Sequence, residues 1–161
     1  MEIRLAELKD FDQIKPIFEN ARKFMVANGN LTQWHDQKQL AENILQDIKS
    51  QSCYLCLDND KIAGVFCFFI GEEKTYNKIY DGEWLNDDLY GVIHRIAVAE
   101  HNKGVATYCI QWCLNKFPNI KIDTHKDNIP MQKTILKNGF TYCGIIKKED
   151  GTERLAYQFV R

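Results

Sequence analysis

The order of helix-like and strand-like segments constrains the fold of this chain more than any single motif. Helical spacing of apolar residues predicts four helices, one following Asp10 and the others over about 36–48, 104–117 and 128–138. Apolar runs and alternation predict seven strands, over residues 2–6, 52–58, 61–70, 89–98, 120–124, 140–148 and 153–160. Because helices alternate with strands only in part, a uniformly parallel sheet is disfavoured. We therefore predict one domain over residues 1–161, of mixed α/β (α+β) class, with a mostly antiparallel mixed sheet and helices on both faces.

Charge and hydropathy argue against two classes of partner. Lys plus Arg number 21 and Asp plus Glu number 22, so no basic excess attracts a nucleic-acid backbone. The longest apolar run, residues 62–70, is nine residues long, whereas a helix that spans a bilayer needs about 20. The first ten residues alternate charged and apolar side chains, which predicts no secretory signal. We expect no nucleic-acid partner and no membrane partner.

The six cysteines predict buried thiols rather than a metal site. Cys53 and Cys56 lie in a strand-like segment, where residues three apart point to opposite faces and cannot share one zinc ion. Cys109 and Cys113 are one helical turn apart, but no second pair matches them and the four histidines lack ligand spacing. We expect no bound metal, reduced thiols and a cytoplasmic location.

The turn between Val98 and the next helix is suited to bind an anion. Gly104 and the small Ala106 let backbone N–H groups approach a phosphate, at a helix N-terminus that favours negative charge. Lys103 adds a cation and Thr107 a hydroxyl. The pattern is not the GxxxxGK[ST] loop, because the lysine precedes the glycine and the first glycine is absent. Taken alone, the turn also fits an ordinary helix start, and both interpretations stay open.

Two segments around this turn resemble a known enzyme family. HRIAVAEHNKGVATYCIQWCL and IDTHKDNIPMQKTILKNGF are similar to the core of the GNAT superfamily of N-acetyltransferases. The family pattern Gln/Arg-x-x-Gly-x-Gly/Ala corresponds to His-x-x-Gly-x-Ala over residues 101–106. The next family block, a helix opened by an asparagine and followed by Gly-Phe, corresponds to Asn128 and Gly139-Phe140. The specific motifs cover about residues 92–140, and the element order extends the resemblance over the whole chain.

The resemblance implies a twisted sheet that splays open after its fourth strand, with acetyl-CoA as cosubstrate in the cleft. It implies pantetheine contacts along Ile96, Ala97 and Val98. It implies pyrophosphate contacts with Asn102, Lys103, Gly104, Val105, Ala106 and Thr107. Asn128 would bridge the cosubstrate and its helix. Two positions depart from the family: His101 replaces a Gln or Arg whose backbone N–H faces the pyrophosphate, and Ile135 replaces a tyrosine that acts as acid toward the leaving thiolate.

The candidate catalytic residues lie on and before the strand over 89–98. Strict alternation would place on one face Tyr90, Val92, His94, Ile96 and Val98. His94 is the only side chain of that set that titrates near pH 7, so it is either a general base or a histidine that shapes the pocket. Glu83 is a second candidate, as a base, as an attractor of a cationic amine or as part of a solvated loop.

Trp34 and Tyr90 are candidates for the acceptor pocket. Trp34 lies in a polar loop between the two N-terminal helices, a region that covers the acceptor pocket in the GNAT fold. It either lines that pocket or seals the helix pair. Tyr90 belongs to the same predicted strand face as His94.

The resemblance and the candidate residues together predict an N-acetyltransferase. The amine of an unidentified small-molecule or peptide acceptor would attack acetyl-CoA directly. The missing tyrosine keeps open a non-catalytic GNAT-fold domain that binds acyl-CoA or has a regulatory role. A small nucleotide-binding domain without acyl chemistry is a third interpretation. The sequence allows a homodimer without indicating one.

Overall fold

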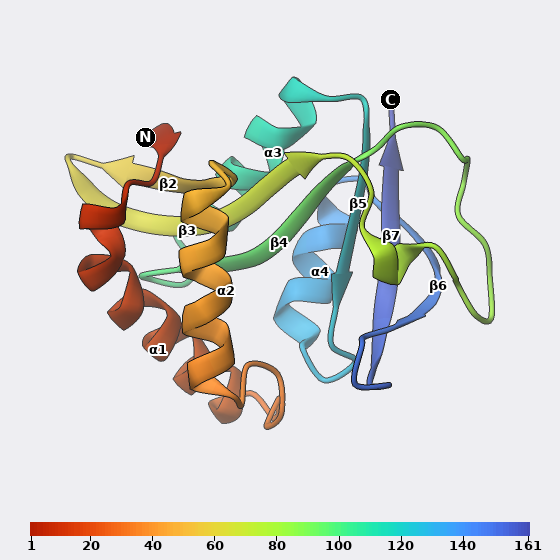
Figure 1. Ribbon diagram of the computed structural model, residues 1–161, viewed down its shortest axis with the longest axis horizontal. Helices are drawn as coiled ribbons and strands as arrows, with labels where there is room; N and C mark the ends of the chain where they lie inside the picture. The colour runs from red at the N-terminus through yellow and green to blue at the C-terminus, as the bar shows by residue number, and fades with distance from the viewer.

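The seven predicted strands form one open, mixed sheet. The computed structural model describes residues 1–161, and the strands lie in the order β1–β2–β3–β4–β5–β7–β6 (Figure 1). Every neighbouring pair is antiparallel except β4 and β5, which are parallel. The prediction of a mixed, mostly antiparallel sheet is therefore confirmed. The strands are β1 (Glu2–Leu5), β2 (Cys53–Asp58), β3 (Lys61–Ile70), β4 (Gly91–Val98), β5 (Asn119–Thr124), β6 (Thr141–Lys147) and β7 (Glu153–Val160).

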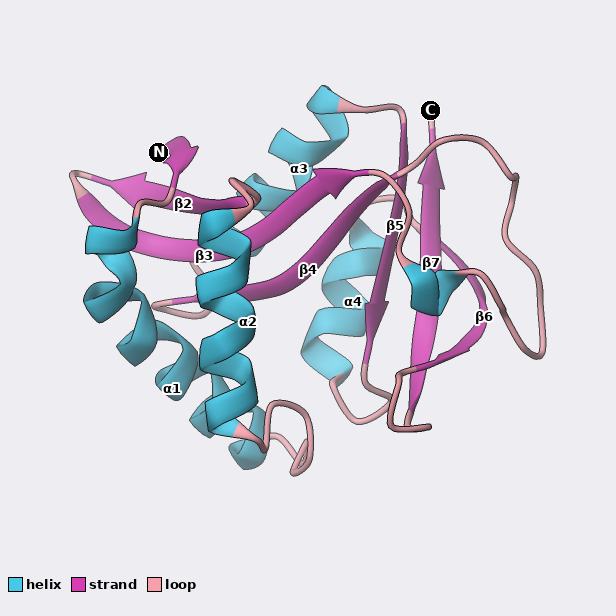
Figure 2. Cartoon of the chain, viewed as in Figure 1, coloured by secondary structure: helices cyan, strands magenta, loops and turns pink.

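The four helices cover both faces of the sheet. They are α1 (Phe11–Ala27), α2 (Gln37–Lys49), α3 (Val105–Lys116) and α4 (Ile129–Lys137). Figure 2 shows α1 and α2 in front of the sheet and α3 and α4 behind it. A core of 13 buried residues joins α1 and α2 to one face, and a core of 15 joins α3 and α4 to the other. None of the helices is both long enough and apolar enough to cross a bilayer.

Local side-chain hydrogen bonds set where the helices near the cleft begin. The Asp36 carboxylate accepts from the N–H of Gln39 and caps α2, and the Asn128 side chain accepts from the N–H of Met131 and caps α4. Asp10 stands at the predicted start of α1, but its carboxylate binds Arg4 and the N–H of Glu7 instead of capping that helix. Asp10 therefore ties the entry of α1 to β1.

The β2–β3 segment confirms that Cys53 and Cys56 lie on opposite faces of the sheet. Its strands form a hairpin around Asn59 and Asp60, whose positive φ angles of 50° and 66° suit a tight two-residue turn. Cys53 packs in the core under α1 and α2, whereas Cys56 packs in the core under α3 and α4. The two sulfurs thus lie on opposite faces of the sheet, as the alternation predicted.

A bulge in β4 breaks the alternation that the sequence predicted for this strand. Val65 of β3 pairs with Ala97, but Cys67 pairs with His94, so β4 holds one extra residue between these pairs. Before the bulge, Val92 lies on the face opposite α3 and α4; after it, Val98 lies in the core on their side. The prediction of one common face for both residues is therefore wrong. The physical reason is the added residue, which reverses the facing of every later side chain.

The sheet splays where β4 leaves β5. Their parallel pairing joins Gly91–Ile93 to Ile120–Ile122 and extends no further, although both strands continue. In Figure 1 the two strands diverge below this contact. The loop over residues 71–90 covers one face of the second half of the sheet, where Tyr76 is buried in a small third core and the Trp84 indole donates to its carbonyl at 2.8 Å.

Candidate functional site

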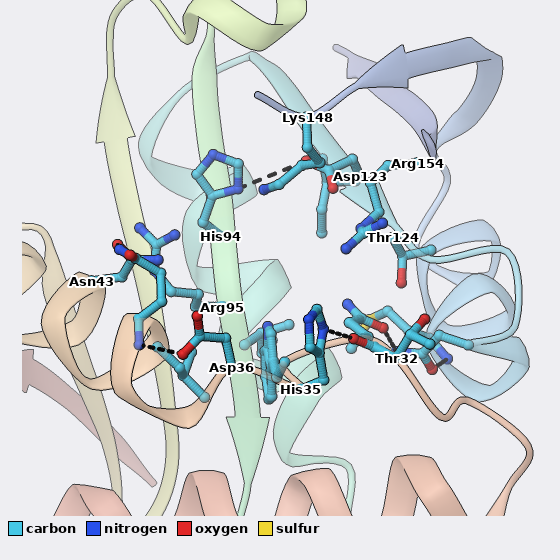
Figure 3. A pocket seen from close by; sticks show the side chains of 18 of the residues that line it. Thr32, His35, Asp36, Asn43, His94, Arg95, Asp123, Thr124, Lys148 and Arg154 are labelled. Carbon is cyan, nitrogen blue, oxygen red and sulfur yellow. Dashed lines mark hydrogen bonds and ion pairs between the residues drawn. The ribbon is translucent and has the colours of Figure 1, made fainter. Parts of the chain in front are cut away.

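A cleft of ≈ 180 Å³ lies where β4 and β5 part. Its walls are the ends of both strands, the start of α4, the loop between α1 and α2, and the β6–β7 hairpin (Figure 3). Past Ile93, the edge of β4 that faces β5 has no strand partner, so its backbone can bind an extended ligand. Ile96 lines the cleft, whereas Ala97 and Val98 bury their side chains in the two cores and can offer a ligand only backbone groups.

His94 lies in an acidic cluster at this divergence. Its Nε2 atom is 3.0 Å from Oε2 of Glu73, and its Nδ1 atom is 3.8 Å from Oδ2 of Asp123. The Tyr76 hydroxyl donates to the same Asp123 oxygen at 2.6 Å. The hydrogen bond with His94 is the largest cause that lowers the pKa of Glu73 to about 2, and it outweighs partial burial, which acts in the other direction. The two carboxylates orient the imidazole.

The bulge turns Arg95 to the same face as His94, but its charge is neutralised there. The φ angle of Arg95 is 50°, a strained value for a side chain of this size. Its guanidinium binds both oxygens of Asp47 on α2, at 2.7 and 2.8 Å. This bidentate pair holds α2 against β4 beside the cleft.

The turn before α3 leaves open space at the helix N-terminus. Asn102 and Gly104 have positive φ angles of 63° and 74°, and apart from Gly104 and its two chain neighbours no residue has an atom within 4 Å of the position that a Cβ on Gly104 would occupy. The first N–H groups of α3 lack helical acceptors and can bind an anion there. Lys103 is exposed beside them. The Thr107 hydroxyl instead accepts from the Asn138 amide at 3.3 Å, which ties it to α4.

The other residues of this turn hold it against the body of the molecule. The His101 ring stacks on Phe24 of α1, with ring centroids 3.5 Å apart. Val105 is buried in the core under α3, and Ala106 packs against that core. The turn is thereby anchored on both sides of its open backbone.

A family model described as the acetyltransferase (GNAT) family matches residues 15–140, which include both motif segments and most of the chain. The chain belongs to the GNAT acetyltransferase family. No curated protein sequence gives a match.

Solved structures of GNAT proteins have the same fold. The GNAT-family acetyltransferase of Streptococcus agalactiae 2603 is 32% identical, with a TM-score of 0.91 over 99% of this chain and 95% of that one. The GNAT-family acetyltransferase of Listeria monocytogenes 4b F2365 is 20% identical, with a TM-score of 0.72 over 99% of this chain and 94% of that one. The corresponding protein of Bacillus cereus ATCC 10987 is 19% identical, with a TM-score of 0.65 over 99% and 96%. The last two show likeness of fold alone.

In this GNAT chain, two further predicted residues reach the cleft. Asn128 lines it, and its amide donates to Gln33 at 3.1 Å, which links the start of α4 to the loop between α1 and α2. Trp34 also lines it, and its ring lies 5.1 Å from that of Phe18. Trp34 thus lines the cleft and also packs against α1.

Two predicted residues lie elsewhere. Glu83 is exposed on the 71–90 loop and does not line the cleft. Tyr90 does not line it either: its hydroxyl accepts from the N–H of Glu73 at 2.9 Å, so it holds the segment that carries Glu73. Ile135, at the position of the family's tyrosine, is fully buried in the core under α3 and α4. No proton donor occupies that position.

Four residues of the site were not predicted from the sequence. Asp123, Lys148 and Arg154 line the cleft, and Glu73 contacts His94. Asp123 follows the apolar start of β5, and the carboxyl ends of neighbouring parallel strands meet at one edge of a sheet. That position was a usable signal. Glu73 gave none, because it lies in an irregular loop whose path depends on tertiary contacts.

Proposed function

We propose that this GNAT protein is an N-acetyltransferase that moves the acetyl group of acetyl-CoA to a primary amine by direct attack. The observation that carries the proposal is the position of His94, which lies beside the open edge of β4 and is oriented by two carboxylates. An ammonium must lose a proton before it can attack a thioester, and a positioned imidazole is a suitable base. Glu73 and Asp123 are then positioning residues, because they act through His94.

The cleft residues fit acetyl-CoA. The open β4 edge over residues 96–98 would bind the pantetheine as an added strand, and the turn over 102–107 would bind the pyrophosphate where Gly104 leaves space. Asn128 would contact the cosubstrate from the opposite wall. Acetyl-CoA, when bound, supplies the acyl group. Unpaired N–H groups of β4 would donate to the oxyanion that develops on its carbonyl.

A non-catalytic acyl-CoA-binding domain would use the same cleft, but it would not require a base at the divergence of β4 and β5. The desolvated Glu73 carboxylate beside His94 therefore favours catalysis. All six cysteines are buried and unpaired, which fits a reducing compartment and supports the cytoplasm as the location.

Thiol release tests the proposal directly. The purified protein is mixed with acetyl-CoA and a panel of primary amines, and free CoA thiol is measured against time. Thermal unfolding is measured in parallel with acetyl-CoA, ATP and NAD. We expect stabilisation by acetyl-CoA alone and amine-dependent thiol release. Stabilisation without release for any amine would favour the binding domain, and stabilisation by ATP or NAD instead would favour a nucleotide-binding domain.

A further inference from the structure

The β6–β7 hairpin brings two cations into the cleft. Lys148 directly follows β6 and Arg154 lies near the start of β7, and both line the cleft while only partly exposed. Figure 3 shows their side chains entering the cavity from the side of Asp123 and Thr124. The pairing of Thr124 with Leu155 places the end of β5 beside the strand that carries Arg154.

Neither cation has a carboxylate partner. No carboxylate oxygen lies within 4.0 Å of either group, and the only side-chain hydrogen bond of Arg154 is to the Glu153 carbonyl at 3.0 Å. Asp123 and Asp150 act on Arg154 only from a distance, and each is already hydrogen-bonded, Asp123 to Tyr76 and Asp150 to Thr152. Arg95 differs, because Asp47 neutralises it. A desolvated cation without a partner gains from an anionic ligand.

Thr124 provides a second, independent indication. It is 1% exposed, it lines the cleft, and its hydroxyl has no hydrogen-bond partner. An orphaned buried hydroxyl is rare in folded proteins and costs free energy. It lies at the end of β5, on the same side of the cleft as the two cations. An oxyanion bound between Thr124, Lys148 and Arg154 would satisfy all three groups.

We infer that the acceptor is a small amine that also carries an oxyanion, a carboxylate or a phosphonate, as an amino acid does. The inference rests on the proposed function, because it specifies the acceptor of the same cleft. The acidic cluster around His94 would attract the ammonium, and Thr124, Lys148 and Arg154 would bind the anion. A cleft that carries both signs of charge selects molecules that carry both.

Matched acceptors test the inference. Each of the common amino acids is compared with its C-terminal amide and with the amine that lacks the carboxyl group, and aminoalkyl phosphonates form a further arm. Thiol release from acetyl-CoA gives kcat/KM for each. We expect at least one free amino acid or phosphonate to exceed its neutral counterparts by about tenfold or more, the factor that a single lost charged contact commonly produces. The two anionic arms distinguish a carboxylate from a phosphonate.

Substitution of the cations provides the second readout. Arg154→Gln and Lys148→Gln should each raise KM for the anionic acceptor about tenfold or more. Neither should change KM for the neutral amine, and acetyl-CoA should still stabilise both variants. Lys147→Gln is the control: it removes a lysine charge one residue from Lys148, where the ammonium lies over the Tyr80 ring. It should change KM for neither the anionic acceptor nor the neutral amine. Thr124→Val tests the hydroxyl at constant shape and should raise the same KM by a smaller factor.

The outcomes separate the inference from the proposed function. If acetyl-CoA neither stabilises the protein nor is consumed, the proposed function fails. If acetyl-CoA stabilises the protein but neutral amines react as well as their anionic counterparts, or no anionic acceptor reacts, only the inference is overturned. If Arg154→Gln lowered kcat/KM equally for anionic and neutral acceptors, the inference would also be overturned, because the effect would indicate a general structural role for Arg154.

Discussion

His94 and Glu73 are 21 residues apart in the chain, yet Nε2 of the first lies 3.0 Å from Oε2 of the second. The contact joins β4 to the loop that follows β3, at the point where the sheet begins to splay. A strand residue and a loop residue thus form one unit, in which the carboxylate sets the orientation of the imidazole. The first two predictions separate the roles of its two members.

Replacement of His94 by glutamine should lower kcat by about 10²-fold or more, since proton transfer by a positioned base contributes at least that factor. Acetyl-CoA should still stabilise the variant, because the turn before α3 is unchanged. Steady-state kinetics with a reactive amine and saturating acetyl-CoA measure the effect. An unchanged kcat with a raised KM for the amine would instead make His94 part of the pocket wall.

Replacement of Glu73 by glutamine should make stability depend less on pH. The pKa of Glu73 is lowered to about 2 in the folded protein, against about 4.3 for an unperturbed glutamate. Its ionised form therefore stabilises the fold above about pH 4.3, and this contribution is lost as the pH falls toward 2. Urea unfolding should show a deficit for Glu73→Gln that shrinks over this window. Glu83→Gln, on the same loop but exposed, should match the native protein throughout; a constant deficit for Glu73→Gln would contradict the assignment.

Replacement of Gly104 by valine should abolish stabilisation by acetyl-CoA, which at about 100 times its Kd amounts to about 2.7 kcal/mol for the native protein. The added side chain would enter the open space at the N-terminus of α3. Gly151→Val is the matched control, because Gly151 also has a positive φ and open surroundings but lies in the β6–β7 turn. Both variants should lose intrinsic stability. Thermal unfolding with and without acetyl-CoA should show stabilisation by the ligand only in Gly151→Val. Stabilisation of both variants would refute pyrophosphate binding at the turn over residues 102–107.

Replacement of Ile135 by tyrosine should change kcat by less than about tenfold, which is under 1.4 kcal/mol of barrier. An alkyl thiol has a pKa of about 8.5, so a CoA thiolate already leaves readily, and deprotonation of the amine is the harder step. Because Ile135 is fully buried, the larger side chain should also destabilise the fold by about 1–3 kcal/mol. Kinetics and urea unfolding measure the two effects. An inert native protein that gains robust turnover from this change would favour the non-catalytic interpretation.

Most of the fold was predictable from the sequence because its signals are local. Apolar spacing located the helices, apolar runs and alternation located the strands, and Asn128 marked the start of α4. The bulge in β4 was not predictable, because its extra residue is accommodated only by pairing with β3. A single strand gives no sign of which residue its partner will skip.

Only the part of the candidate site that lies in sequence motifs was predictable. His94 and the turn before α3 lie within continuous motifs, so their place along the chain limits their place in space. Glu73, Lys148 and Arg154 come from loops and from a hairpin at the far edge of the sheet, and only the tertiary structure brings them to the cleft. Glu83 and Glu73 are both acidic residues of one polar loop, and nothing in their immediate sequence distinguishes the one that meets His94.

The bulge also limits which changes in the sequence of β4 the fold can accept. The side chains that point away from α3 and α4 change from one half of the strand to the other. Up to His94 they belong to even-numbered residues, and from Arg95 onward they belong to odd-numbered residues. Deletion of one residue here would change the composition of the strand very little, yet it would move every side chain in one half of the strand to the opposite face of the sheet. Either His94 would be removed from its carboxylates or Arg95 would be driven into an apolar core. β4 should therefore tolerate no change of length.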